Sequence, residues 1–193
     1  MIELGKFAKQ FLSRATSHVM RWHHRHAAWK ESLSEHHALT ARMSYELGWL
    51  VQDLGICDLD TVRPEAIMRA ALYHDEPEIV TGDIPASAKA LIPGVREAVQ
   101  RWEETAMSLL WEHYPERLQA RLRSVVRRED LSEIERQILH YADGMSAYAY
   151  ARDQVIMGNQ YFEDIVAYTE GPDYLGKLRY PWLLKLRSLT GLP

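Results

Sequence analysis

The segment "ALYHDEPEIVTGDIPASAK", residues 71–89, joins an apolar helical pattern to a cluster of ionisable side chains. His74, Asp75, Glu76, Glu78 and Asp83 lie within ten residues of one another. Carboxylates and an imidazole in this density repel or lose solvation if they are buried together. The segment therefore indicates a positively charged partner among them, and a bound cation is the leading hypothesis.

The residues around this segment predict where each charged group lies. Pro64 suits the first turn of a helix, and apolar residues at three- and four-residue steps carry that helix over 64–74, with His74 on its inward face. Gly82 and Pro85 predict a turn or irregular loop that holds Asp83, before helix resumes near Ser87 or Gly94.

Helical periodicity also dominates the rest of the chain, and alternating strand patterns are nearly absent. We expect helices over about 7–15, 34–54, 95–112, 116–128 and 132–158 and a short final helix near 182–186. Ser34 is the expected cap of the second, Gly55 its stop, and Ser132 with Glu135 a capping box for the fifth. The expected apolar faces are Phe7, Phe11, Leu12 and Ala15; Leu39, Met43, Leu47 and Leu50; Val99, Trp102, Ala106, Leu109 and Leu110; and Trp182, Leu183, Leu184 and Leu186.

Composition bounds the class of protein. A chain of 193 residues with 47% apolar content suits a single domain, 1–193, and the periodicity makes it an all-α bundle of five to eight helices. The mild net charge of −4 and mixed signs do not favour a nucleic-acid polymer as partner. Cys57 is the sole cysteine, which excludes a disulfide framework. With no segment apolar enough to span a membrane and no signal-like terminus, we expect a cytoplasmic protein that does not bind membranes.

Four side chains on the expected inward faces are candidate metal ligands. These are His36, His74, Asp75 and Asp143, the last among apolar neighbours in the fifth long helix. Two imidazoles and two carboxylates suit one divalent transition ion such as Co, Mn, Zn, Fe or Ni. The alternative is a separate partner for each charge, for example an arginine beside Asp143.

At this point the chain resembles a known family. His36, His74-Asp75 and Asp143 match the H…HD…D pattern of HD-domain metal-dependent phosphohydrolases, which are all-helical. "RW" at 21–22, "SEH" at 34–36, "YHDEPEIVTGDIP" at 73–85, Lys89 and "ADGMSAY" at 142–148 are similar in order and spacing to the bacterial 5′-deoxynucleotidase branch. The resemblance covers about residues 5 to 165 and implies a helical bundle with the metal between helices.

The resemblance also implies catalytic and substrate-binding roles. Asp75 is a ligand in the catalytic pair, and Glu78 matches the carboxylate that orients or deprotonates the attacking water. Arg21 matches a phosphate-binding arginine, whose fork suits two phosphoryl oxygens. For Glu78 a plain helix-terminal carboxylate, and for Arg21 an exposed helix-end side chain, remain the alternatives.

Three further positions complete the expected substrate site. Asp83 matches the residue that holds the sugar 3′-hydroxyl, and Trp22 the aromatic that crowds out a 2′-hydroxyl. Lys89 could add positive charge near the phosphate. The alternatives are a turn residue for Asp83, core packing for Trp22 and a solvated lysine.

One stretch departs from the family pattern. "RWHHRHAAWK" places His23, His24, Arg25 and His26 after Trp22, where the related nucleotidases have fewer imidazoles. This cluster either faces the base or additional phosphates, or lies incidentally on the surface, and we favour the surface slightly.

Three functions follow from these patterns. The leading one is hydrolysis of the 5′-phosphate of deoxynucleoside monophosphates. The second is a triphosphohydrolase that releases triphosphate, as in the similar compact phage dATP hydrolases, with a further Mg on the triphosphate. The third is a non-catalytic nucleotide-binding module, which Glu78 disfavours. The resemblance implies a homodimer or larger homo-oligomer.

Overall fold

The structure, a computed structural model, describes residues 15–58, 60–85, 89, 93–112, 114–170 and 178–190. Within these residues every regular element is helical, and the extended pairing is one isolated antiparallel bridge between Met20 and Ser32. The elements are α2 (Ala15–His18), α3 (Leu33–Asp53), α4 (Pro64–Ala71), α5 (Glu78–Thr81), α7 (Val95–Trp111), α8 (Glu116–Arg127), α9 (Glu133–Ile156), the 3-10 turn η1 (Gln160–Phe162), α10 (Glu163–Glu170) and α11 (Pro181–Thr190).

The all-α prediction is confirmed, although the described ranges hold nine α-helices rather than five to eight. Two of the additional helices, α2 and α5, are single turns of four residues, too short to leave a periodic pattern. The expected helix with Phe7, Phe11 and Leu12 lies outside the described residues, as does Ser87.

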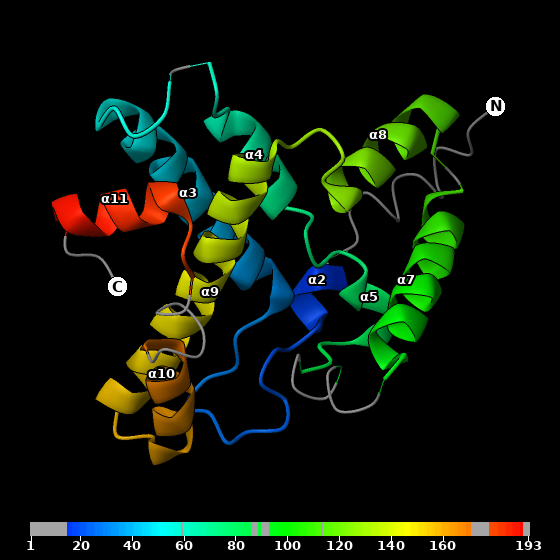
Figure 1. Cartoon of the computed structure of the whole chain (residues 1–193). Coiled ribbons are helices and arrows are strands. Elements are labelled where there is room, and N and C mark those ends of the chain that lie inside the picture. The colour runs from blue at the N-terminus through cyan, green and yellow to red at the C-terminus, as the bar shows by residue number, and fades with distance from the viewer. Residues whose placement is uncertain are drawn as a thin grey trace.

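Three helices that are distant in sequence build the centre of the fold. α3 packs against α4 and α9, and α4 also contacts α9 (Figure 1). Buried apolar side chains fill the space between them and α11: Val51, Ile67, Ala70, Ile138, Leu139 and Leu183 are members of this core. The two helices α3 and α4 approach closely at Gly48 of α3, where an added Cβ would lie 3.0 Å from Pro64 Cβ. Gly48 therefore lets α3 and α4 cross at short range.

Both long helices begin with a capping box. In α9, Ser132 and Glu135 form the expected one. In α3 the cap is Ser32 rather than Ser34, and its partner is Glu35. The chain favours Ser32 because its extended backbone is paired with Met20 and its hydroxyl lies three residues before a glutamate. Gly55, at φ +59°, follows the end of α3 as expected.

α7 and α8 stand apart from α11, across the molecule from it (Figure 1). The predicted helices are confirmed. Of the apolar face expected for α7, Val99, Ala106 and Leu110 are half-buried, but Trp102 and Leu109 are 53% and 63% exposed. Met107 and Trp111, which were not expected in that face, are buried. Periodicity locates an apolar stripe but not its tertiary partner, and α7 packs chiefly on the short α5.

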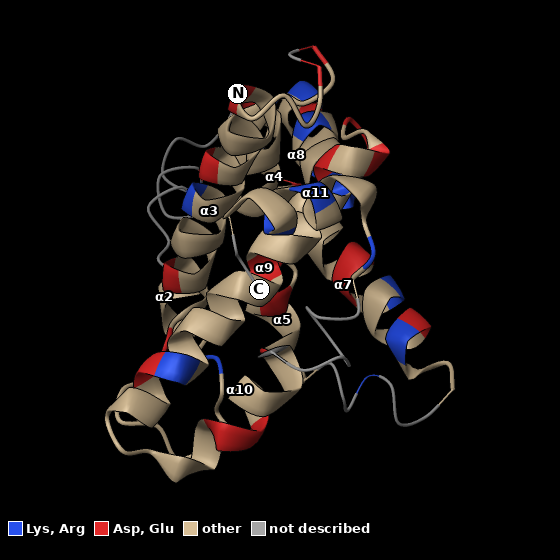
Figure 2. Cartoon of the chain, turned by 60° about the vertical axis from the view of Figure 1, so that its left-hand side comes forward, with Lys and Arg blue, Asp and Glu red and all other residues tan. Residues whose placement is uncertain are grey.

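The final helix is mostly as expected. Trp182, Leu183 and Leu186 of α11 are buried, while Leu184, expected in the same core, is 45% exposed because it faces away from α3 and α9. Charges of both signs are spread over the visible helices (Figure 2). No helix in the described ranges has the length and apolarity that a membrane crossing requires.

Candidate metal centre and active site

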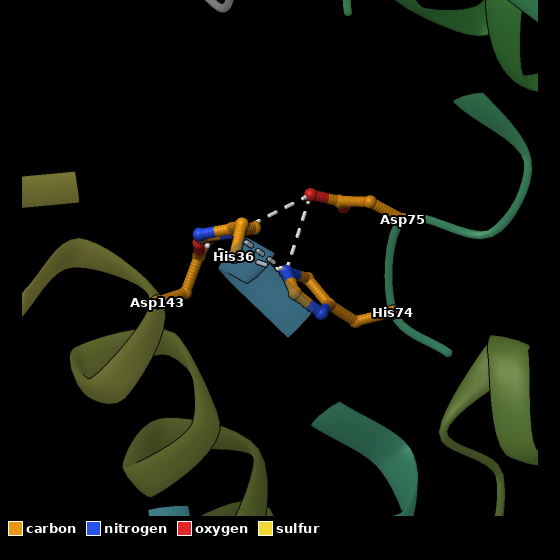
Figure 3. A group of neighbouring side chains, drawn as sticks. All are labelled: His36, His74, Asp75 and Asp143. Carbon is orange, nitrogen blue, oxygen red and sulfur yellow. Dashed lines mark hydrogen bonds and ion pairs between the residues drawn. The ribbon is translucent and has the colours of Figure 1, made fainter. Parts of the chain in front are cut away.

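The four predicted ligands meet where the three central helices converge. His36 comes from the first turns of α3, His74 and Asp75 from the segment after α4, and Asp143 from the middle of α9 (Figure 3). Each offers one ligand atom, and these atoms all lie within 4.8 Å of one another. His36 Nε2 is 3.2 Å from His74 Nε2 and 3.0 Å from Asp143 Oδ1, and His74 Nε2 is 3.1 Å from Asp75 Oδ2.

Neighbouring groups orient both imidazoles with Nε2 towards this point. His74 Nδ1 is 2.7 Å from the carbonyl oxygen of Ala71, which can only accept, so Nδ1 carries a proton and Nε2 has a free lone pair whenever the ring is neutral. His36 Nδ1 is 3.0 Å from Ser146 Oγ, also on α9. Both imidazoles therefore present Nε2 to the same small space.

The electrostatics of the cluster call for a positive charge. Burial alone lowers the pKa of His74, but Asp75 and Asp143 outweigh it and raise that pKa to about 10. Loss of solvent opposes ionisation of the two carboxylates, yet the neighbouring imidazoles hold the pKa of both below the usual range. A divalent cation at this point would supply positive charge and could use the two neutral imidazoles as ligands.

The donor set fits such an ion. Two nitrogen and two oxygen atoms at one point match a borderline transition metal, and an alkaline-earth ion alone would want more oxygens. The side chains of Asp75 and Asp143 remain 28% and 35% exposed, whereas His36 is fully buried. One side of the cluster is therefore open to water or a substrate oxygen.

Glu78 lies next to the cluster at the start of α5 and is only 8% exposed. Burial, reinforced by the charges of Asp75 and Asp83, raises its pKa to about 8, although Lys89 Nζ lies 3.4 Å from its Oε1 and opposes the shift. A carboxyl group in this range can exchange a proton near neutral pH.

Arg21 is buried beside the same space, so the alternative of an exposed arginine is wrong. Its side chain is 12% exposed, and Nη1 lies 3.7 Å from Glu31 Oε2. Burial opposes the charged form, but Glu31, Asp143 and Asp75 raise the pKa of Arg21. Nη1 has no hydrogen-bond partner in the described part of the chain. A buried guanidinium with an unused donor is suited to an anion.

Trp22 and Asp83 are joined directly. The backbone N–H of Trp22 donates to Asp83 Oδ2 at 3.1 Å, across 61 positions of sequence. The indole ring stacks on Tyr150 with centroids 5.7 Å apart, so core packing does describe one of its faces. Asp83 lies on a loop, as predicted.

A cavity of about 810 Å³ is lined by His74 and by residues of α7 and α8. Cationic side chains line much of it: Lys89, Arg96, Arg123, Arg127 and Arg128. Lys89 contacts Glu78 and is 20% exposed, so it is not a freely solvated lysine.

The histidine-rich segment does not point as one group to the metal cluster. His23, His24 and His26 are exposed, in agreement with the surface interpretation. Arg25 instead reaches α10, where both its Nη atoms donate to Asp164 at 2.7 Å.

Sequence reasoning missed two residues of the site. Ser146 is three residues after Asp143 on α9, and this helical spacing is a signal that could have found it. Glu31 accepts from Trp22 Nε1 at 3.3 Å and pairs with Arg21, but nothing in its local sequence predicts this.

The fold and site define a class of protein. A solved HD-domain phosphohydrolase from Listeria innocua superposes with a TM-score of 0.77 at 19% identity, covering 97% of this chain and 86% of that one. A protein from Pyrococcus horikoshii superposes with a TM-score of 0.68 at 18% identity, covering 97% and 98%. The fold is thus that of the HD-domain phosphohydrolases.

The sequence comparisons assign the chain to a narrower family than the fold does. The model of the family described as 5′-deoxynucleotidase YfbR-like matches residues 9–173. A 5′-deoxynucleotidase of Pasteurella multocida is 30% identical over 145 residues, 75% of this chain and 73% of that protein. One of Vibrio vulnificus is 28% identical over 144 residues, 75% and 73% of the two chains. The chain belongs to the YfbR-like 5′-deoxynucleotidase family and is a phosphohydrolase.

Proposed function

We propose that this protein hydrolyses the 5′-phosphate of deoxynucleoside monophosphates, giving deoxynucleoside and inorganic phosphate. The observation that carries the proposal is the convergence of His36, His74, Asp75 and Asp143 within 4.8 Å, beside the buried Arg21 with its unused donor. The names of the relatives agree with this substrate class.

The four converging side chains would hold one divalent transition ion, Co, Mn, Zn, Fe or Ni. When bound, such an ion polarises a phosphoryl oxygen and lowers the pKa of water. Glu78 would take a proton from the attacking water and then give it to the 5′-oxygen of the departing deoxynucleoside; its raised pKa suits both transfers near neutral pH. Arg21 neutralises charge on the phosphoryl oxygens through Nη1.

The sugar would lie against Trp22 and Asp83. Because Asp83 Oδ2 is occupied by the Trp22 N–H, its other carboxylate oxygen accepts from the 3′-hydroxyl. Trp22 crowds the position of a 2′-hydroxyl, so ribonucleotides are excluded by shape. Burial of Glu78 beside the cluster disfavours a non-catalytic module, which has no use for a base.

The cavity between α7 and α8 favours a second candidate, the triphosphohydrolase. Its lining includes Lys89, which contacts Glu78, and four arginines, against the two acids Glu103 and Glu104, of which Glu104 pairs with Arg127. A longer phosphate chain, carrying a further Mg, could extend in this direction.

A substrate and metal panel separates these functions. Deoxynucleoside monophosphates, ribonucleoside monophosphates and deoxynucleoside triphosphates are each assayed with Co, Mn, Zn and Mg, and phosphate and triphosphate are detected separately. We expect phosphate from the deoxynucleoside monophosphates alone. Release of triphosphate would establish the second candidate instead.

Variants of α9 supply the controls. Asp143→Ala should abolish the activity, whereas Asp153→Ala, an exposed acid on the same helix, should leave it within about twofold. Full turnover by Asp143→Ala would contradict the metal-site proposal. Size-exclusion chromatography with light scattering tests the homo-oligomer, which stays a prediction.

A further inference from the structure

The connection between α2 and α3 carries Trp22 and is tied at both ends. Arg21 N donates to the Glu31 carbonyl and Leu33 N to the Val19 carbonyl, each at 2.8 Å. Between these two hydrogen bonds, residues 22–30 form a loop over the ends of α9, η1 and α10. This loop is the segment that departs from the family pattern.

Trp22 adopts a backbone conformation that is unfavourable for a residue with a bulky side chain. Its φ of +58° lies in the left-handed region, where a bulky side chain is rarely found. Hydrogen bonds on both sides of the residue hold it there. Its N–H donates to Asp83, and its carbonyl accepts from Arg25 N at 2.9 Å and from Lys30 Nζ at 3.1 Å.

The indole ring is supported by aromatic side chains from two other elements. Tyr150 of α9 stacks on it with an interplanar angle of 8°, and Phe162 meets it edge-on with centroids 5.4 Å apart. Phe162 is fully buried and in turn lies under the Arg25 guanidinium, 5.8 Å from its ring centroid. Arg25 is thus linked to Trp22 directly, through its backbone N–H, and indirectly, through the ring of Phe162.

Arg25 is itself held from α10. Both Nη atoms donate to the two Asp164 oxygens at 2.7 Å, and Nη1 also donates to the Tyr161 carbonyl. The paired fork geometry fixes the direction of the guanidinium as well as its charge. The hydrogen bond from Arg25 lowers the pKa of Asp164, so this carboxylate is ionised at neutral pH.

We propose that Asp164 and Arg25 are positioning residues that hold Trp22 in its left-handed conformation and thereby set the selectivity for deoxynucleotides. Neither residue lies in the metal cluster. Once the pair is broken, the Arg25 contacts to Trp22 and Phe162 lose their support, while the bonds from Asp83 and Lys30 remain. Trp22 then spends part of its time in an ordinary backbone conformation, which opens the space that a 2′-hydroxyl would occupy. The inference rests on the proposed function.

The rest of the loop has anchors that do not depend on this pair. Ala28 N donates to Gln154 Oε1 at 2.8 Å, and Asn159 Nδ2 donates to the His26 carbonyl at 2.9 Å. These bonds keep the loop on α9 when Asp164 changes. The effect should therefore be confined to the Trp22 end of the loop.

The test compares four proteins with dNMP and NMP substrates: the wild type, Asp164→Asn, Asp164→Glu and Glu163→Gln. Glu163 is the matched control, since it is an exposed acid in the same first turn of α10 with no ion pair in the described residues. We expect the ratio of kcat/KM for dNMP to that for NMP to fall about fivefold in Asp164→Asn, the upper range for one exposed ion pair. Asp164→Glu should restore it within twofold, and Glu163→Gln should not change it.

A second readout does not need activity. In protein labelled with ¹⁵N, the indole signal of Trp22 is assigned from its loss in Trp22→Phe. We expect that signal to shift and broaden in Asp164→Asn but not in Glu163→Gln. An unchanged Trp22 signal, or an unchanged selectivity ratio with a lower melting temperature, overturns the positioning role. A wild type without dNMP hydrolysis contradicts the proposed function, while the indole signal still decides how Trp22 is held.

Discussion

The carboxylate of Glu135 links α4 and α9, the helices from which three of the candidate metal ligands extend. Removing its charge gives a quantitative prediction. Glu135 is fully buried in the first turn of α9 and is the glutamate of its capping box with Ser132. Its carboxylate accepts from Arg63 N at 2.8 Å, Arg63 Nε at 2.9 Å and Arg63 Nη2 at 2.8 Å. Arg63 is the residue before α4, so this group joins α4 to α9.

The size of the effect follows from the pKa of Glu135. Burial opposes its ionisation, but the hydrogen bonds from Arg63 and Ser132 lower the pKa from 4.5 to about 2. At about 1.36 kcal/mol per pKa unit this corresponds to roughly 3 kcal/mol. Because the Arg63 side chain is 53% exposed, solvent screening reduces the expected value to about 2 kcal/mol.

Glu135→Gln removes the charge and keeps a side-chain oxygen that can still accept from Ser132 N. We expect the free energy of unfolding to fall by about 2 kcal/mol at pH 7, or about 4–8 °C in melting temperature for a chain of this size. Because the pKa of Glu135 is lower in the folded state than in the unfolded state, its charge stabilises the fold at pH values above 4.5. This contribution is lost as the pH falls towards 2. The difference between wild type and variant should therefore shrink from pH 6 to pH 3.

Urea unfolding in the presence of a chelator, followed by circular dichroism at each pH, measures this difference without a contribution from metal. Glu133→Gln is the matched control, because Glu133 lies in the same turn but its side chain is 76% exposed. It should change stability by less than about 0.5 kcal/mol. A difference for Glu135→Gln that is independent of pH, or no larger than that of the control, would refute this reasoning.

Three further predictions follow. Gly48→Ala should lower the free energy of unfolding by about 1–2 kcal/mol in urea melts, since overpacking against Pro64 at 3.0 Å outweighs the gain in helix propensity. Removal of a transition metal held at about 100 times its Kd should lower the melting temperature by about 5–10 °C, and Asp143→Ala should show no such metal-dependent shift in calorimetry. Glu78→Gln should lower kcat by about 10²–10⁴-fold while elemental analysis finds the same metal content, because Glu78 is outside the ligand set.

Much of the fold was readable from local patterns. Helical spacing predicted α3, α4, α7, α8 and α9, and the Ser132-Glu135 capping box was correct. The helix expected over 64–74 ends at Ala71, so His74 lies in the turn after α4 and not on its inward face. Pro64, Gly55 and the Asp83 loop also lie where their backbone preferences indicated. These features depend on a few neighbouring residues, so one sequence is sufficient. The extent of the domain, 1–193, stays a prediction.

The errors concern burial against distant partners. Trp102 and Leu109 carry a helical apolar stripe but are exposed, and Leu184 lies on the outer side of α11. Ser34 and Ser32 are both good caps locally. The bridge from Met20 to Ser32, which needs residues twelve positions apart, places the boundary. The local sequence pattern predicts that a segment is helical and has an apolar stripe. Only the packing of the helices decides which side of each helix is buried.

The site divides in the same way. The expected inward faces made His36, His74, Asp75 and Asp143 candidates, and the resemblance to the HD-domain pattern favoured a shared cation over a separate partner for each charge. Their approach to 4.8 Å, the burial that raises the pKa of Glu78, and the unused donor of Arg21 arise from the way three helices cross. Desolvation and distance are properties of the assembled chain, and residues far apart in the chain acquire them only when the helices pack.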